Sequence, residues 1–275
     1  ESSAASDVYK RQLGFRAGGI QAGLRTTPGL DLALIVNDGP ADVVAGVFTT
    51  NRVCAAPVQW SRHATADHKA RAVIVNAAVA NACTGIDGFA DCDITFSRVD
   101  SDACMSTNDT VVAMASGASG ISLTGDELTD ALTELCAILA RQLVADAEGS
   151  HHDVKVTVTG AISTEAAVAV AREVTRSNLV KTAIAGNDPN WGRILAAIGC
   201  VPENVAPFDP DQVDVSINDI QICKAGGIGE DRNLVDMRPR EVHIDIELHA
   251  GDAEAAVWTN DLTHQYVEEN SAYTS

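Results

Sequence analysis

Residues 181–193, KTAIAGNDPNWGR, combine residue types that bind small polar molecules. The apolar residues 181–185 are predicted to form a strand that leads into a polar loop. Arg193, at the start of the following helix, would present a planar fork of donors beside free backbone N–H groups, which together suit a carboxylate. Asn190 adds an amide and Lys181 adds a second cation. The alternative is that Arg193 only pairs with one of the many acidic residues.

Glu148 is a second candidate, because its negative charge lies where the local electrostatics disfavour an anion. The apolar pattern predicts a helix over residues 124–149, and Glu148 lies near its carboxyl end, where the helix dipole disfavours an anion by about 0.3–1 kcal/mol. Such a residue indicates a function, although an exposed loop carboxylate is the alternative. Asn270 and Ser275 lie in the polar run EENSAYTS at the end of the chain, where a solvated tail is the alternative.

Short strands and a few helices must position these candidates. Strands are predicted where apolar residues alternate or follow one another over a few positions, at 32–38, 46–51, 71–81, 153–161 and 241–248. Residues 111–117 are predicted to be a strand or a short helix. Helices are predicted at 124–149, with Thr124 and Glu127 as a capping box, at 164–177, and from about residue 260.

The order of these elements favours a layered α/β protein. A hairpin is predicted at residues 213–223, with Asn218 and Asp219 in the turn, so part of the sheet is antiparallel. Strands and helices do not alternate strictly, and no G-x-G-x-x-G joins a strand to a helix, which argues against a dinucleotide-binding fold. We therefore expect mixed sheets with helices on their outer faces.

The composition argues against several kinds of partner. The chain has 275 residues, 46% of them hydrophobic, and a formal net charge of −19. Nucleic acids and anionic membranes attract clustered Lys and Arg, so neither is expected as a partner. No apolar run is long enough to cross a bilayer and no charged-then-apolar leader opens the chain, so we expect a cytoplasmic protein. Seven widely spaced cysteines without a C-x-x-C pair argue against a disulfide framework or a zinc site, and no metal is expected.

Several longer runs resemble one known family. They are TNRVCAAPVQWSR, NACTG, MSTNDTV, DAEG, NDPNWGR and WTNDLTHQYVEENSAYTS. In this order, and over residues 14–275, they are similar to the bifunctional glutamate N-acetyltransferase / ornithine acetyltransferase family of arginine biosynthesis. The resemblance implies an α/β/β/α sandwich with mixed sheets, as in the related self-processing amidohydrolases.

The family's reaction moves an acetyl group from N2-acetylornithine to glutamate. A precursor cleaves itself ahead of a Thr, whose hydroxyl then carries the acetyl group, and a Thr-Gly pair stabilises the oxyanion. The resemblance implies N-acetylornithine, ornithine and glutamate as partners, acetyl-CoA as an alternative acetyl donor, no resident cofactor, and a hetero-tetramer of cleaved chains. It implies substrate contacts at Glu148, Asn270 and Ser275, with support from Lys181, Asn190 and Arg193.

The segment that should carry the nucleophile is missing from this sequence. Residues 88–102 pass directly from the family's early segment to its late one, with the join near 91–94, and neither an Ala-Thr-Met-Leu-like run nor an S-T-G loop occurs. Thr65 and Thr182 are the nearest imitations, but their surroundings differ from the family's. We therefore assign no catalytic residue and predict that the chain is inactive.

Other interpretations remain alongside this one. Residues 1–12 match nothing in the family and are interpreted as a non-native scar, followed by an N-terminal lobe at 13–93 and a C-terminal lobe at 94–275. A self-processing aminopeptidase relative would share the fold. A non-catalytic binding or scaffold remnant, which docks onto an intact paralogue, is the alternative from a different class.

Overall fold

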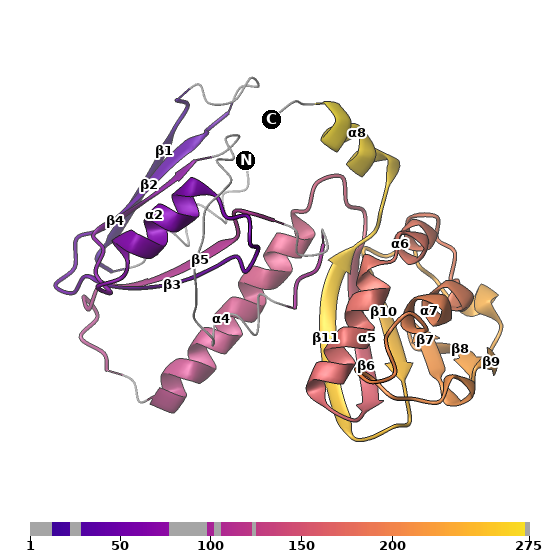
Figure 1. Cartoon of the computed structure of the whole chain (residues 1–275). Helices are drawn as coiled ribbons and strands as arrows, with labels where there is room; N and C mark the ends of the chain where they lie inside the picture. The colour runs from indigo at the N-terminus through magenta and orange to yellow at the C-terminus, as the bar shows by residue number, and fades with distance from the viewer. Residues whose placement is uncertain (1–12, 23–28, 77–97, 102–105, 123–124, 273–275) are drawn as a thin grey trace. The chain divides into compact units, whose positions relative to one another are not determined.

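The computed structural model describes residues 13–22, 29–76, 98–101, 106–122 and 125–272 (Figure 1). Contacts within the chain divide them into two compact units. Unit 1 holds the described residues up to 76 and from 106 to 132, and unit 2 holds 98–101 and 133–272. Helix α4 (Gly125–Ala145) begins in unit 1 and ends in unit 2. The division into lobes at residue 93 stays a prediction, and the proposed scar at 1–12 lies outside the described residues.

Unit 2 is built on a six-stranded mixed sheet with the order β11-β6-β10-β7-β8-β9. The central strand β10 runs parallel to β6, whereas the other neighbours are antiparallel. The strands are β6 (Asp153–Ala161), β7 (Asp214–Ile217), β8 (Ile220–Lys224), β9 (Gly227–Ile228), β10 (Glu241–Glu247) and β11 (Ala253–Asn260). The strands predicted at 153–161 and 241–248 are confirmed.

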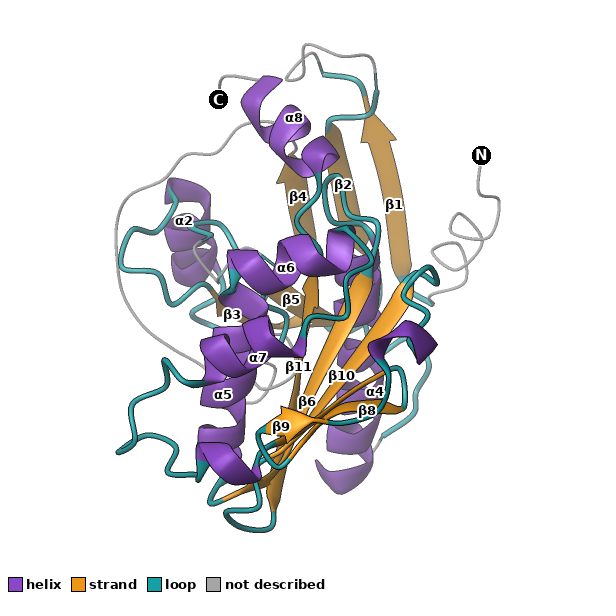
Figure 2. Cartoon of the chain, turned by 90° about the vertical axis from the view of Figure 1, so that its right-hand side faces the viewer, coloured by secondary structure: helices purple, strands orange, loops and turns teal. Residues whose placement is uncertain are grey.

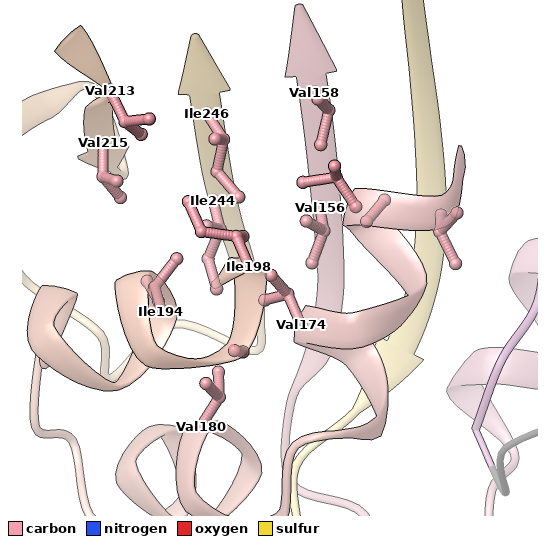
Figure 3. Close-up of a cluster of buried hydrophobic side chains, with 14 of the residues drawn as sticks. Val156, Val158, Val174, Val180, Ile194, Ile198, Val213, Val215, Ile244 and Ile246 are labelled. Carbon is pink, nitrogen blue, oxygen red and sulfur yellow. The ribbon is translucent and has the colours of Figure 1, made fainter. Parts of the chain in front are cut away.

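One face of this sheet is buried under three helices (Figure 2). They are α5 (Thr164–Arg176), α6 (Asn178–Ala185) and α7 (Trp191–Ile198). Alternate residues of the strands, such as Val156 and Ile244, pack against helix residues such as Val174 and Ile198 (Figure 3). Each fully buried Val or Ile side chain stabilises the fold by about 1.5–3 kcal/mol, so this core anchors unit 2.

Short polar side chains begin the covering helices. The hydroxyl of Ser163 accepts from the N–H of Ala166, which confirms the helix predicted from residue 164, and Ser177 caps α6 in the same way. The strand predicted at 181–185 is wrong, because these residues belong to α6. Val180 and Ile184 lie four residues apart on its buried side. A short apolar run of this kind fits a strand or a helix equally well, and here the serine cap starts a helix.

The predicted hairpin is confirmed, because Asn218 and Asp219 join β7 to β8 with φ angles of 48° and 68°. The final helix, α8, spans His264–Ala272. It begins later than predicted, because β11 continues to Asn260 beside β6. Two short 3-10 helices, Pro210–Gln212 and Arg232–Leu234, complete unit 2.

Unit 1 contains two small antiparallel sheets. One has the order β1-β2-β4 and the other pairs β3 with β5. Its elements are β1 (Phe15–Ile20), β2 (Leu32–Asn37), β3 (Val43–Phe48), α2 (Ala56–Ala64), β4 (Ala72–Asn76) and β5 (Thr110–Ala115). The strands predicted at 32–38 and 71–81 are confirmed over their described parts. The structure assigns 111–117 to a strand, and the strand predicted at 46–51 starts earlier.

Within the described residues, no helix is both long and apolar enough to span a membrane.

The predicted helix at 124–149 is confirmed as α4, although it ends at Ala145. Its expected capping residue Thr124 lies outside the described residues. Helices and mixed sheets therefore make up the α/β architecture that the pattern predicts.

Candidate functional site

A cavity of about 220 Å³ lies in unit 2 and brings together three of the predicted site residues. Glu148 lines it from the turn after α4, Lys181 from α6, and Asn270 from α8. The remaining polar side chains in its wall are those of Ser101, Asn260, Asp261 and Tyr266. Segments that are far apart in the sequence thus meet at one small cavity.

Glu148 lies in a turn beyond the end of α4, where its side chain is exposed and open to a ligand. The turn is held closely against α8. Gly149 has a φ of 62°, and a Cβ atom there would lie 2.3 Å from the backbone nitrogen of Tyr266. Glycine is required here both by the left-handed conformation and by the lack of space.

Arg240 fixes the other side of this turn. Its guanidinium donates to the carbonyl of Ala145, the last residue of α4, at 2.6 Å and forms an ion pair with Asp153 at 3.0 Å. The hydrogen bond with Asp153 raises the pKa of Arg240. A cation at the carboxyl end of a helix also interacts favourably with the helix dipole.

Lys181 is buried and supplies a cation to the cavity wall. Its Nζ donates to the carbonyl of Ser101 at 2.7 Å and to the hydroxyl of Thr259 at 3.4 Å. Hydrogen bonds of this kind offset the free energy of removing an ammonium from water. The backbone carbonyl of Lys181 also accepts from the N–H of Leu262 at 3.2 Å, so α6 is tied to the segment after β11.

Asn270 lines the cavity from α8, and its amide donates to the carbonyl of Tyr266 at 2.9 Å. The amide oxygen can still accept from a ligand, because this bond uses only the nitrogen. Ser275, the other predicted residue of the C-terminal run, lies outside the described residues.

Asn190 and Arg193 are not among the described residues that line the cavity. The Asn190 side chain accepts from the N–H of Arg193 at 3.2 Å and so caps α7. The Arg193 guanidinium donates to the carbonyl of Leu179 at 2.7 Å and to the hydroxyl of Thr182 at 3.4 Å, both on α6. In this structure Asn190 caps α7 and Arg193 joins α7 to α6, and neither side chain lines this cavity.

The two threonines that resemble the family nucleophile both bond a backbone carbonyl of a helix, Thr65 just after the end of α2 and Thr182 within α6. The hydroxyl of Thr65 donates to the carbonyl of Ser61 at 2.8 Å, and that of Thr182 to the carbonyl of Asn178 at 2.8 Å. Neither belongs to the described lining of the cavity. The join near residues 91–94 lies outside the described residues.

Sequence reasoning missed a buried pair at the cavity. Asp261 is in its wall, and its Oδ2 lies 2.8 Å from Nδ1 of His152. The available signal was the polar run NDLT directly after an apolar strand, because polar residues at a strand end often bond neighbouring loops. Among the described residues, no group of three His, Cys, Asp or Glu side chains could hold a metal ion.

The cavity wall therefore combines charged groups of both signs. It offers an exposed carboxylate at Glu148, an ammonium at Lys181 and an amide at Asn270. A charged ligand gains from opposite charges at both of its ends, and the small volume suits a molecule of amino-acid size.

Comparison with known proteins gives the family. The ArgJ family matches residues 16–95 and 90–275. The arginine biosynthesis bifunctional protein ArgJ of Bifidobacterium longum is 40% identical over 384 residues, which cover 95% of this chain and 98% of the relative. The protein of the same name from Streptomyces coelicolor is 38% identical over 379 residues, with the same two coverages.

A solved structure agrees with these matches. The crystal structure of the arginine biosynthesis bifunctional protein ArgJ from Bacillus halodurans has a TM-score of 0.59 and 35% sequence identity, and the match covers 65% of this chain and 87% of that chain. The match to the Bifidobacterium protein extends over more residues than the 275 of this chain, so the relative contains residues without a counterpart here. With matches over nearly its whole length, this chain belongs to the ArgJ family of arginine-biosynthesis acetyltransferases and has the family's α/β sandwich fold.

Proposed function

We propose that the unit 2 cavity is the amino-acid site of a glutamate N-acetyltransferase / ornithine acetyltransferase. The observation that carries this proposal is the convergence of Glu148, Lys181 and Asn270 on one cavity of about 220 Å³. The name of the relatives, a bifunctional protein of arginine biosynthesis, supports ornithine, N-acetylornithine and glutamate as the ligands.

Each of the three side chains has a separate role in this proposal. Glu148, which is exposed, accepts from an ammonium of the amino acid. The buried charge of Lys181 makes its end of the cavity favourable for the α-carboxylate, and Asn270 offers its amide oxygen. Hydrogen bonds between charged groups are shorter and stronger than neutral ones, so two charged ends orient the ligand.

We further propose that the chain binds its amino acid but does not transfer acetyl groups. Acyl transfer needs a nucleophile and oxyanion donors, and the loss of one oxyanion donor alone lowers kcat by about 10²–10³. The family's sequence motifs for the nucleophile and for the oxyanion donors are both missing from the sequence. The hydroxyls of Thr65 and Thr182 donate to nearby helix carbonyls and do not replace them.

Calorimetric titration with L-ornithine tests the site. We expect wild-type protein to bind and Glu148→Gln to bind at least about tenfold more weakly, because a hydrogen bond to a charged group contributes about 1.5–3 kcal/mol. Glu203→Gln is the matched control, since Glu203 is exposed in unit 2 but is not in the cavity wall. Equal affinities of wild type and Glu148→Gln, or no binding by the wild type, would contradict the proposed site.

An acetyl-transfer assay tests the second part. N-acetylornithine and glutamate are incubated with the purified chain, and N-acetylglutamate is measured. We expect no product above the rate without protein. Product formation at the rate of the Bifidobacterium relative, assayed in parallel, would show that the missing runs are not needed.

A further inference from the structure

The last residue of β11, Asn260, and the three residues that follow it, Asp261, Leu262 and Thr263, form a set of bonds that we call the NDLT clamp. Its side chains bond the turn that carries Glu148. The Asn260 amide donates to the carbonyl of Val144 at 2.8 Å and to the hydroxyl of Ser150 at 2.9 Å. The clamp thus holds this turn at both of its ends.

Thr263 joins the two walls of the cavity through one hydroxyl. Its Oγ1 donates to the carbonyl of Gly149 at 2.5 Å, next to Glu148, and accepts from the N–H of Tyr266 at 3.0 Å. The second bond caps the first turn of α8, the helix that carries Asn270. Thr263 therefore couples the positions of Glu148 and Asn270, alongside His151, whose Nε2 lies 3.3 Å from Oε1 of Gln265 on α8.

Asp261 lines the cavity, but its oxygens are occupied. Oδ1 accepts from the N–H groups of His151 and His152 at 2.9 and 3.0 Å, and Oδ2 lies 2.8 Å from Nδ1 of His152. Nε2 of His152 lies 2.9 Å from the carbonyl of Met237, which can only accept, so this nitrogen carries a proton. Whichever partner holds the proton between Nδ1 and Oδ2, the pair has no net charge.

The two acidic side chains in the wall consequently differ in their exposure and in whether another protein group compensates their charge. Glu148 is exposed and available, whereas Asp261 is buried and neutralised within the protein. We propose that Asp261 and Thr263 are positioning residues, which set the separation of Glu148 and Asn270 and thereby the length of the amino acid that the cavity accepts. This inference rests on the proposed amino-acid site.

The proposal that Asp261 acts by positioning, and Glu148 by its charge, is tested by comparing variants of both residues in the calorimetric titration with L-ornithine. Asp261→Asn can still accept at one oxygen and can donate to a neutral His152, so we expect it to lose much less ornithine affinity than Glu148→Gln. Asp261→Ala removes all of these bonds, and we expect a loss of about tenfold or more, as for removal of a buried hydrogen-bonding partner. Equal losses in Asp261→Asn and Glu148→Gln would show that Asp261 acts through its charge, and would overturn the assignment.

The length selection is tested with Thr263→Val, which removes the hydroxyl and keeps the shape, and with Thr263→Ser, which keeps the hydroxyl. We expect wild type and Thr263→Ser to prefer L-ornithine to the one-carbon-longer L-lysine by about tenfold or more, as one methylene typically allows. Thr263→Val should lose most of this preference. The control is Thr159→Val, which removes a hydroxyl that bonds Glu247 at 2.6 Å outside the cavity wall. An unchanged preference in Thr263→Val would overturn the inference.

Amide hydrogen exchange separates this inference from the proposed function. Thr263→Val, but not Thr159→Val, should speed exchange in residues 147–151 and 264–270. If no variant binds ornithine but this difference is found, the proposed function is wrong and the coupling of the two walls stands. If ornithine binds but exchange in both segments is unchanged, the amino-acid site stands and the clamp is wrong.

Discussion

Units 1 and 2 form strands by the same local rule but differ in what covers them. In unit 2, helices α5, α6 and α7 close one face of the sheet over a continuous core (Figure 3). In unit 1, the buried apolar cluster of the described residues comprises Cys54, Ala55 and Val58, with Phe48 against it. Leu34 and Ile74 pair across β2 and β4 with large exposed fractions.

This difference shows that strand pairing and burial are separable. Short runs of apolar residues are sufficient for β2 and β4 to pair, but a sheet gains most of its stability when one face is covered. The Bifidobacterium relative contains residues that have no counterpart in this chain, and the two family matches meet at residues 90–95, within unit 1 or at its border. Unit 1 is therefore where this chain should be least stable.

The largest expected effect comes from truncating equivalent isoleucines in the two units. Ile244 is fully buried on β10, whereas Ile74 on β4 is 70% exposed. We expect Ile244→Ala to lower the free energy of unfolding by about 2–5 kcal/mol, because it leaves a cavity in the core. Ile74→Ala should change it by less than about 0.5 kcal/mol, as for other surface substitutions.

Urea denaturation, followed by tryptophan fluorescence, measures both variants. Trp258 on β11 reports on unit 2, and the exposed Trp60 reports on unit 1. A similar loss in both variants would mean that the unit 1 sheet is covered in solution, and the comparison between the units would fail.

Two glycines give a closer comparison, because their backbone angles are nearly the same. Gly149 in unit 2 has a φ of 62° and Gly120 in unit 1 a φ of 67°. An added Cβ would meet the backbone of Tyr266 at Gly149 but nothing within 4 Å at Gly120. A non-glycine residue in this conformation costs about 1–2 kcal/mol, so Gly120→Ala should lose about that much.

Gly149→Ala should lose more than Gly120→Ala, because the backbone of α8 must also move away. The same urea titrations measure the difference, and ornithine affinity provides a second readout, since the displaced turn carries Glu148. If the two variants are equally destabilised, the turn and α8 are not packed as closely as the structure describes.

The parts of this structure that the sequence predicted are those with local causes. The alternation in β6, the helical spacing of apolar residues in α5 and the paired turn residues Asn218 and Asp219 each act within a few positions. The short run in α6 was predicted wrongly, because strand and helix patterns coincide over five residues.

The cavity could not be derived in this way. Glu148 and Asn270 meet only through the packing of α8 against the turn after α4. The helix dipole singled out Glu148, but a shared site with Asn270 was expected from the family resemblance. The pair of His152 and Asp261 joins segments more than a hundred residues apart, so the polar run NDLT marks Asp261 but not its partner. Arg193 had the right residue type at a helix start, but its Nη1 donates to the carbonyl of Leu179 on α6, and its side chain is not among those that line the cavity.

The smallest expected effect is a difference in labelling between two equally hidden thiols. Cys54 is 1% exposed in the small cluster of unit 1, and Cys223 is 0% exposed in the core of unit 2. Burial, together with the nearby charge of Asp214, raises the pKa of the Cys223 thiol, so less of it is the reactive thiolate at neutral pH. Alkylation of either residue in the native protein also requires local opening.

We expect iodoacetamide at neutral pH to label Cys54 on the order of ten times faster than Cys223, because regions with few buried contacts open more readily. Mass spectrometry of the digested protein measures both rates, and the exposed Cys200 should react before either. Equal rates for Cys54 and Cys223 would mean that the two units open together. The sparse cluster of unit 1 would then be as well protected as the core under α5, α6 and α7.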